Sequence, residues 1–282
     1  MRRLEWKDTE ILRFRGIELA CATGLLRNIS VAANAGVGQV TGIRPQKSYE
    51  LALKRALRPL QVVFNHLFGS GFICRGVGRL IQKYFEDCGA FLEVGCGSME
   101  LRRYLPRGHW YNAIDLAYSE FQLRRALSSE FVNLAMASAT DIPLADGSVT
   151  VVVATEVFEH IPPIEDAVRE IRRIMQARGK LICSIPNNFY HKYQVLGENT
   201  DHVNKWTFRG FPEFMSRFGF DLLESRRVGY WVPLSYWLPI ARHVNLLRDL
   251  YLPITPKAEY YTSNFLYVFE LTDKSSQLDI EQ

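Results

Sequence analysis

The chain has 282 residues, which fits one large α/β domain with additions. Hydrophobic residues make up 48% of it and charged residues 23%, proportions that exclude a disordered or fibrous protein. No run of about eighteen uncharged apolar residues occurs, so no transmembrane helix is expected. Charged residues begin at Glu5, soon after Met1-Arg2-Arg3, and leave no room for the apolar part of a secretory signal.

The charge is unevenly distributed, and the cysteines are scattered. The first 80 residues hold 13 Lys and Arg against 5 Asp and Glu. Such a basic segment could contact phosphate, an anionic membrane or an acidic partner, or it could be a solvated helical surface. The five cysteines form no C-x-x-C pair, so no disulfide framework or zinc site is expected. We expect a cytoplasmic protein, with contact at a membrane surface as an open alternative.

The elements follow one another in a regular order after a less regular start. Residues 1–75 are expected to form a basic helical N-terminal extension, with helical spacing clearest after Ser48. Helices and strands alternate over residues 76–227, the expected core. The expected strands are 90–94, 110–114, 132–135, 149–154, 180–185 and 222–227. The expected helices are 78–87, 99–104, 119–127, 164–175 and 211–218.

Three segments follow this core. Residues 228–262 are rich in aromatic residues and carry prolines, and we expect an insertion or a lid there. A closing strand is expected within 263–272 and a polar tail over 273–282. Strands that alternate with helices favour an α/β fold with a mostly parallel, doubly wound sheet.

A glycine turn follows the first strand of the core. It is part of the sequence Glu93-Val94-Gly95-Cys96-Gly97-Ser98, and its glycines allow a ligand to approach the backbone closely. Asp115 stands twenty residues after Gly95, at the end of the next strand, where a carboxylate can accept both hydroxyls of a ribose.

Two classes of cofactor use this geometry, the nicotinamide dinucleotides and S-adenosylmethionine (SAM). The dinucleotide pattern G-x-G-x-x-G fails, because Glu100 replaces its third glycine and would oppose a pyrophosphate. Glu93 is of no use to a phosphate, whereas a carboxylate suits the ammonium and sulfonium of SAM. These residues therefore favour SAM.

The sequence resembles the class I methyltransferases of the type-11 group, which includes the ubiquinone-pathway O-methyltransferases. Glu93–Gly97 is similar to their first motif. Further similar segments follow in the same order, namely Thr140–Val149, Glu156–Ile161, Arg169–Ile174, Gly179–Leu181, Ser184–Asn187 and His202–Phe220. This resemblance implies a Rossmann-like, doubly wound, mostly parallel seven-stranded sheet with helices on both faces, and SAM as the cofactor.

The resemblance also assigns the residues that would bind SAM. Those at the methionine part are Glu93, Gly95, Cys96, Gly97 and Ser98. Those around the ribose, the adenine and the methyl group are Asp115, Leu116, Ala139, Thr155 and Glu156. No metal-ligand cluster is visible along the chain, so no metal requirement is expected.

Three positions depart from the family pattern. Met99 replaces the third glycine of the first motif and would place a side chain in the cofactor loop. Ser138 replaces an acidic residue on the adenine side, and Thr150 replaces an aspartate before the fourth strand's core. These changes leave open a partner protein that kept the fold and lost catalysis.

His160 and His202 are the candidate catalytic residues. His160 follows the fourth strand and could deprotonate a hydroxyl acceptor, or it could cap the next helix. His202 is a second candidate base, or it only fixes its loop.

The expected function is SAM-dependent methyl transfer to a hydroxyl of a small-molecule, sugar or lipid-linked acceptor. The aromatic stretch 228–262 would suit an apolar acceptor. An RNA methyltransferase is the alternative enzyme, supported by the basic N-terminal segment, although no recognised RNA-binding module is present. The residues do not predict the oligomeric state.

Overall fold

A computed structural model describes residues 3–7, 9–14, 17–22, 72–85, 89–118, 123, 126, 130–189, 201–230 and 262–272. The helix expected after Ser48, most of the helix expected over 119–127, the aromatic stretch from residue 231 and the polar tail lie outside these residues. Within the described ranges, no helix is long and apolar enough to cross a bilayer.

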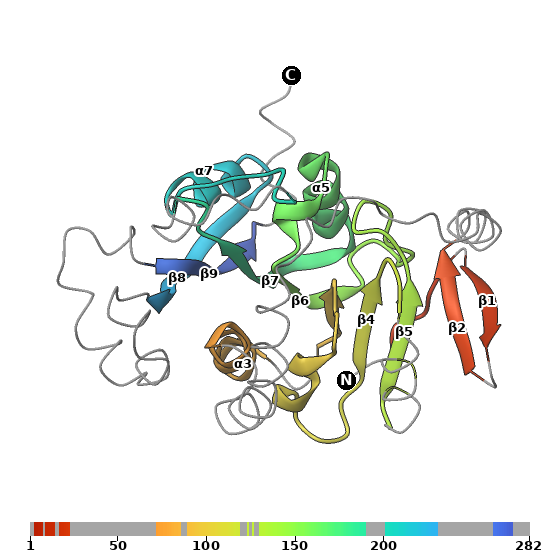
Figure 1. The fold of residues 1–282 in the computed structure, drawn as a ribbon. Coiled ribbons are helices and arrows are strands. Elements are labelled where there is room, and N and C mark those ends of the chain that lie inside the picture. The colour runs from red at the N-terminus through yellow and green to blue at the C-terminus, as the bar shows by residue number, and fades with distance from the viewer. Residues whose placement is uncertain are drawn as a thin grey trace, which may run out of the picture.

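One sheet of nine strands organises the described residues. Its strands are β1 (Thr9–Phe14), β2 (Ile17–Ala22), β3 (Phe91–Val94), β4 (Tyr111–Asp115), β5 (Val132–Met136), β6 (Val149–Thr155), β7 (Met175–Pro186), β8 (Phe220–Tyr230) and β9 (Thr262–Leu271). Their spatial order is β1-β2-β5-β4-β3-β6-β7-β9-β8 (Figure 1). The strands from β5 to β7 are parallel, and β9 lies antiparallel between β7 and β8. The seven strands from β5 to β8 confirm the predicted seven-stranded, mostly parallel sheet.

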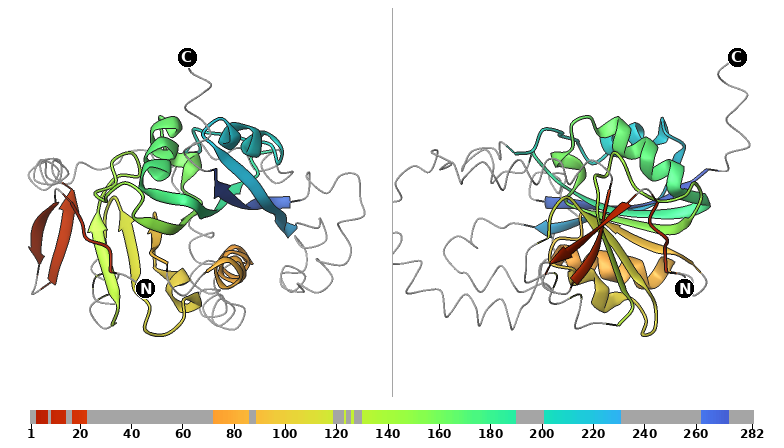
Figure 2. Two further views of the ribbon diagram at one scale, coloured as in Figure 1. Left: turned by 180° about the vertical axis from the view of Figure 1, so that it is seen from behind. Right: turned by 90° about the vertical axis from the view of Figure 1, so that its right-hand side faces the viewer.

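The N-terminal residues add a hairpin to this sheet. β1 and β2 pair antiparallel, and β2 pairs parallel with β5 (Figure 2). The helical extension predicted for residues 1–75 is therefore wrong for 9–14 and 17–22. Ile17, Leu19 and Cys21 alternate with period two, a strand pattern, and the edge of β5 supplies backbone partners that local spacing cannot reveal.

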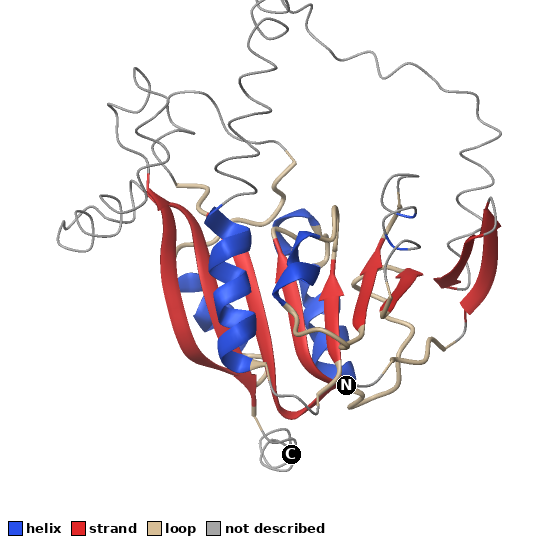
Figure 3. Ribbon diagram, turned by 90° about the horizontal axis from the view of Figure 1, so that it is seen from below, coloured by secondary structure: helices blue, strands red, loops and turns tan. Residues whose placement is uncertain are grey.

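Helices cover both faces of the sheet, as predicted. The helix α3 (Phe72–Tyr84) lies on one face, and α5 (Ile164–Ile174) and α7 (Gly210–Ser216) lie on the other (Figures 1 and 3). Two short 3₁₀ helices, η1 (Glu100–Tyr104) and η2 (Phe158–His160), follow β3 and β6. The helix predicted over 99–104 is thus a 3₁₀ helix, which is the form that such short segments commonly take.

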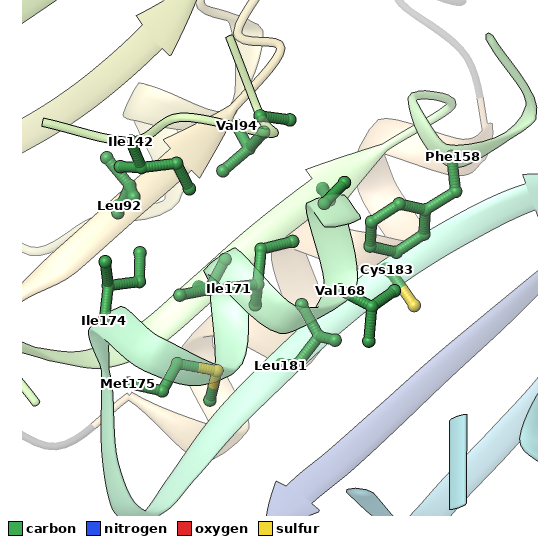
Figure 4. Packing of buried hydrophobic residues seen from close by; sticks show 14 of the residues in the cluster. Leu92, Val94, Ile142, Phe158, Val168, Ile171, Ile174, Met175, Leu181 and Cys183 are labelled. Atoms are coloured by element: carbon green, nitrogen blue, oxygen red, sulfur yellow. The ribbon is translucent and has the colours of Figure 1, made fainter. Parts of the chain in front are cut away.

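Each face of the sheet carries its own apolar cluster. On the α5 face, the buried residues recur at helical spacing and are Ile164, Ala167, Val168, Ile171 and Ile174. Figure 4 shows Val168 and Ile171 packed near Leu181 of β7. Each such side chain, fully buried, stabilises the fold by about 1.5–3 kcal/mol.

Two asparagines hold the start of the described chain against the sheet. Asn112 and Asn133 lie opposite each other on β4 and β5, and Asn133 Nδ2 donates to Asn112 Oδ1 at 2.9 Å. Asn112 Oδ1 also accepts from Leu4 N at 3.0 Å, and Asn133 Oδ1 accepts from Trp6 Nε1 at 3.0 Å. The segment 3–7 is thereby fixed beside β4 and β5, an arrangement that the sequence did not indicate.

Glu224 joins the helix α3 to the edge strand β8. Its Oε2 accepts from Lys83 Nζ at 2.5 Å and from Tyr84 Oη at 2.9 Å, and its Oε1 accepts from Arg226. Burial alone would raise the pKa of Glu224, but these donors outweigh burial and hold the pKa at about 2.

We predict that Glu224→Gln lowers the free energy of unfolding by about 1 kcal/mol near neutral pH, because Lys83 is half exposed and the pair is partly screened. The folded-state pKa lies below that of an unfolded glutamate, about 4.3. The ionised form therefore stabilises the fold fully above that value, and this contribution is lost as the pH falls through 2. Denaturant titrations at pH 7, 5 and 3 should show that the difference in free energy of unfolding between the wild type and Glu224→Gln becomes smaller as the pH falls. An advantage that does not change with pH would contradict this role.

Candidate active site at the carboxyl edge of the sheet

The site residues predicted from the sequence gather at one edge of the sheet. Glu93 lies near the end of β3, Asp115 ends β4, and Thr155 ends β6. Ala139 follows β5 by three residues and is buried. Because these strands are parallel and adjacent, their carboxyl ends meet at the same edge, where ligands of open α/β sheets bind.

The glycine turn after β3 is closed at one glycine and open at the other. Gly95 has φ +69°, and a Cβ there would lie 2.5 Å from Val157 Cγ2. Gly97 has φ +45°, and a Cβ there would meet nothing within 4 Å. Open space therefore lies beside Gly97, where a ligand could approach the backbone.

Asp115 is held in position by the backbone of two neighbouring loops. Its Oδ2 accepts from Gly97 N at 2.9 Å, and its Oδ1 accepts from Leu116 N at 2.8 Å. The carboxylate thus ties the glycine turn to the end of β4. Leu116, beside it, is 62% exposed and offers an apolar surface to a flat ligand group.

Glu93 is an enclosed carboxylate. It is 3% exposed and accepts a hydrogen bond from Tyr111 Oη. Burial raises its pKa, the Tyr111 hydrogen bond lowers it, and the balance is a pKa of about 8. Among the residues that the structure describes, no lysine or arginine forms an ion pair with Glu93. A cationic ligand at this edge would supply the missing charge.

Cys96 and Met99 are parts of the apolar packing. The Cys96 thiol lies 3.7 Å from Tyr118 Oη, and burial raises its pKa, which argues against a nucleophile. Met99 adopts the left-handed conformation, with φ 56°, which explains why related proteins can have glycine there. Its side chain is buried in the cluster that contains Leu101 and Tyr111. The prediction that this side chain occupies the cofactor loop is therefore wrong.

Glu156 is fixed by three strands. Ser184 Oγ of β7 donates to its Oε1 at 2.6 Å, and Asn264 Nδ2 of β9 donates to its Oε2 at 2.7 Å. Burial raises the pKa of Glu156. The sequence did not reveal Ser184 and Asn264 as partners, because the contact depends on the antiparallel register that places Asn264 opposite Pro186.

The two candidate catalytic histidines lie next to each other. Their ring centroids are 5.0 Å apart. They meet because Val203 N and Asn204 N both donate to the Glu159 carbonyl oxygen, at 2.8 and 3.2 Å, which draws the loop after residue 200 onto η2. The alternative role of His160 as a helix cap finds no support, since α5 begins after Pro163 without a side-chain cap.

The polar neighbours of these rings are defined. His160 Nδ1 lies 3.0 Å from the Asp201 carbonyl oxygen, and His160 Nε2 lies 3.6 Å from Glu159 Oε1. His202 Nδ1 lies 2.8 Å from Asn188 Oδ1. Burial and the nearby His160 lower the pKa of His202, and burial followed by the charge of Glu156 raises the pKa of Glu159.

Comparison with known proteins agrees with this geometry. Residues 92–183 match the family described as "Methyltransferase domain", type 11. The 2-methyl-6-phytyl-1,4-hydroquinone methyltransferase of Synechocystis is 26% identical over 163 residues, which cover 52% of this chain and 51% of that protein. The chain therefore matches about half the length of this curated relative.

Solved structures show the same fold. The 1,6-didemethyltoxoflavin-N1-methyltransferase of Burkholderia thailandensis, solved with S-adenosylhomocysteine, is 13% identical with a TM-score of 0.52 and covers 82% of this chain and 93% of its own. The [4+2]-cyclase SpnF is 15% identical with a TM-score of 0.50 and covers 70% of this chain and 81% of its own. Likeness at this level shows the fold, and SpnF shows that the fold alone does not fix the reaction.

The core of the chain is a class I methyltransferase domain, the class of SAM-dependent enzymes. Within that class, the segment 92–183 matches the type-11 group. The residues present fit SAM, because the carboxylate of Asp115 is held at the strand end, the space beside Gly97 is open, and the buried Glu93 has no lysine or arginine partner among the described residues.

Two alanine substitutions test the shape of the glycine turn. Gly95→Ala should lower the free energy of unfolding by about 1 kcal/mol for the left-handed backbone and by a further 1–3 kcal/mol, roughly, for the overlap with Val157. Gly97→Ala should cost only about 1 kcal/mol, since its Cβ meets no neighbour. Denaturant titration measures both values. An equal decrease in the free energy of unfolding of Gly95→Ala and Gly97→Ala would show that the turn is not open at Gly97.

Proposed function

We propose that this protein transfers the methyl group of SAM to a hydroxyl oxygen of an apolar, ring-bearing or lipid-linked acceptor. The observation that carries the proposal is the pair of carboxylates at the glycine turn. Asp115 is oriented by Gly97 N–H, and Glu93 is buried without a cationic partner among the described residues. SAM has a ribose for the first and a positively charged methionine part for the second.

Each part of SAM has residues to hold it in this proposal. Asp115 accepts the ribose hydroxyls, and Leu116 and Ala139 flank the adenine. The methionine part lies along Gly95, Cys96, Gly97 and Ser98, with its ammonium toward Glu93.

Thr155 and Glu156, at the end of β6, border the methyl group. The Thr155 hydroxyl is buried and has no hydrogen-bond partner among the described residues, so it is available to an atom of a ligand.

The protein's own contribution to the reaction is alignment and proton removal. SAM supplies a methyl group that its sulfonium has already activated. The strand ends hold donor and acceptor in line, which replaces a bimolecular encounter by a fixed geometry. His160 Nδ1–H donates a hydrogen bond to the Asp201 carbonyl oxygen. The other ring nitrogen, Nε2, then has the lone pair that can take the acceptor's hydroxyl proton. A base of this kind accelerates such a step by about 10²–10⁴-fold. His202 lies beside it as the second candidate base.

The acceptor class rests on two supports. The curated relative acts, by its name, on a phytyl-substituted hydroquinone, which is a ring with hydroxyls and an apolar chain. The stretch 228–262 is rich in aromatic residues that suit such a molecule. A cytoplasmic setting, with contact at a membrane surface as an alternative, remains the prediction from the sequence.

Calorimetry with SAM tests the proposal. The protein should bind SAM with a micromolar dissociation constant and should not bind NADH. Asp115→Asn should weaken SAM binding at least tenfold, since it removes the charge that accepts the ribose hydroxyls. The matched control is Asp166→Asn, the same change at an exposed aspartate of α5 that pairs with Arg169. This control should bind SAM as the wild type does.

Two results would overturn the proposal. A folded protein that binds no SAM would be a partner protein that kept only the fold. Equal SAM affinity in Asp115→Asn and wild type would place the cofactor elsewhere.

A further inference from the structure

Three side chains with metal-binding atoms converge beyond the end of β6. They are Glu159 and His160 of η2 and His202 of the following loop, and their ligand atoms all lie within 4.8 Å of one another. Sequence reasoning expected no metal ligands, because His202 is far from the other two along the chain and only the fold brings them together.

Polar contacts at Nδ1 orient both imidazole rings. The Asp201 carbonyl oxygen can only accept, so His160 Nδ1 carries the proton, and the Nε2 lone pair faces Glu159 Oε1 at 3.6 Å. His202 Nδ1 lies 2.8 Å from Asn188 Oδ1, and a proton on Nδ1 in this contact would make Nε2 the metal-binding nitrogen of the ring. The ligand atoms of Glu159, His160 and His202 therefore face one another, and a divalent cation between them would be held by all three.

Glu159 supplies a second, independent observation. Its side chain is 1% exposed, and its Oε2 has no hydrogen-bond partner among the described residues. A buried carboxylate oxygen without a partner destabilises the fold and persists where a cation or ligand satisfies it. Lysine and arginine form no ion pair with Glu159 within the described ranges.

We propose that Glu159, His160 and His202 bind a divalent transition-metal ion. Imidazole nitrogens prefer zinc, cobalt, iron or nickel to magnesium, which prefers oxygen ligands. The 3.6 Å between His160 Nε2 and Glu159 Oε1 is close to the separation of about 3.4 Å between two ligands of a tetrahedral zinc site. The other ligand atoms lie within 4.8 Å of one another, so binding would draw them closer.

The surroundings of these ligands match those of metal sites. Metal-bound histidines usually donate their other ring N–H to a carbonyl or carboxylate, which fixes the tautomer. The corresponding neighbours are the Asp201 carbonyl oxygen, beside His160 Nδ1, and Asn188 Oδ1, beside His202 Nδ1. His160 is 45% exposed, so the ion can enter from solvent and keep a coordination position open.

The role of the ion rests on the proposed methyl transfer, whereas the ion site itself does not. A hydroxyl oxygen of the acceptor that coordinates the ion would release its proton more readily to solvent water, which reaches the half-exposed His160, because the positive charge stabilises the oxyanion. With the ion bound, His160 is a ligand, and the ion takes the place of its Nε2 as the group that promotes proton loss.

Titration of the chelator-treated full chain with Co²⁺, followed by visible absorption, tests the site. We expect one equivalent to bind, Zn²⁺ to displace it, and Mg²⁺ in millimolar excess to leave it in place. Glu159→Gln and His202→Gln should each weaken Co²⁺ binding at least tenfold, and Asn188→Leu, which removes the partner of His202, about tenfold. His109→Gln is the matched control, since His109 precedes β4 and its ring contacts the carbonyl oxygens of Pro106 and Arg107 and the Phe85 ring rather than the proposed ligands. It should bind Co²⁺ as the wild type does.

Two further measurements keep the outcomes distinct. Thermal unfolding in chelator should show Glu159→Gln at least as stable as the wild type, because it removes a buried charge, so lost metal binding cannot be lost folding. Asp115→Asn should keep its Co²⁺ affinity while losing SAM, which separates failure of the metal site from failure of the proposed function. Absence of stoichiometric Co²⁺ binding, or equal affinity in wild type, Glu159→Gln and His202→Gln, would overturn the proposal.

Discussion

Buried carboxyl groups without a lysine or arginine partner in the described part of the chain are the constraint on which the site depends. Glu93 and Glu159 are almost fully enclosed, and the two oxygens of Glu156 are held by the neutral donors Ser184 and Asn264. Such carboxylates destabilise a fold unless something positive binds beside them. The pKa of each is raised by burial, which means that each resists ionisation in the absence of a cation. A positively charged ligand at the carboxyl edge would therefore stabilise the ionised form of each.

The sheet explains why these groups come together. β3, β4, β5 and β6 are parallel neighbours, so the residues that follow them meet at one edge although they are far apart in sequence. The apolar clusters on both faces fix the strands, and the backbone then fixes the polar groups, as Gly97 N–H does for Asp115. The antiparallel strand β9 adds Asn264 to this edge. The strands thus fix the positions of the site residues, and the loops at their ends carry the polar groups of the site.

The elements of the core could be predicted because their signals are local. β6 is a continuous apolar run and α5 has apolar residues at helical spacing, so both lie within a residue or so of their expected bounds. The positions of Gly95, Gly97 and Asp115 could be predicted for the same reason, since a turn and the next strand end define them. The N-terminal hairpin could not, because β2 depends on the distant edge of β5.

The missed features of the site are contacts between distant segments. Ser184 and Asn264 meet Glu156 only through the order of β6, β7 and β9. His202 reaches His160 only because the loop backbone bonds to the Glu159 carbonyl. Met99 is a different case, since its sequence position was assigned correctly but its side chain turns into the apolar cluster below α3. One-dimensional spacing predicts which residues end strands, and it does not predict where their side chains pack.

Proton release on SAM binding tests the role of the buried charge most directly. With a pKa of about 8, Glu93 is mostly protonated at pH 7, and the cationic methionine part should drive it to ionise. Calorimetry at pH 7 in buffers of different ionisation enthalpy should show nearly one proton released per SAM bound, and Glu93→Gln should abolish this release and weaken binding. Binding without proton release, with the same affinity in Glu93→Gln, would contradict a site built to bind positive charge.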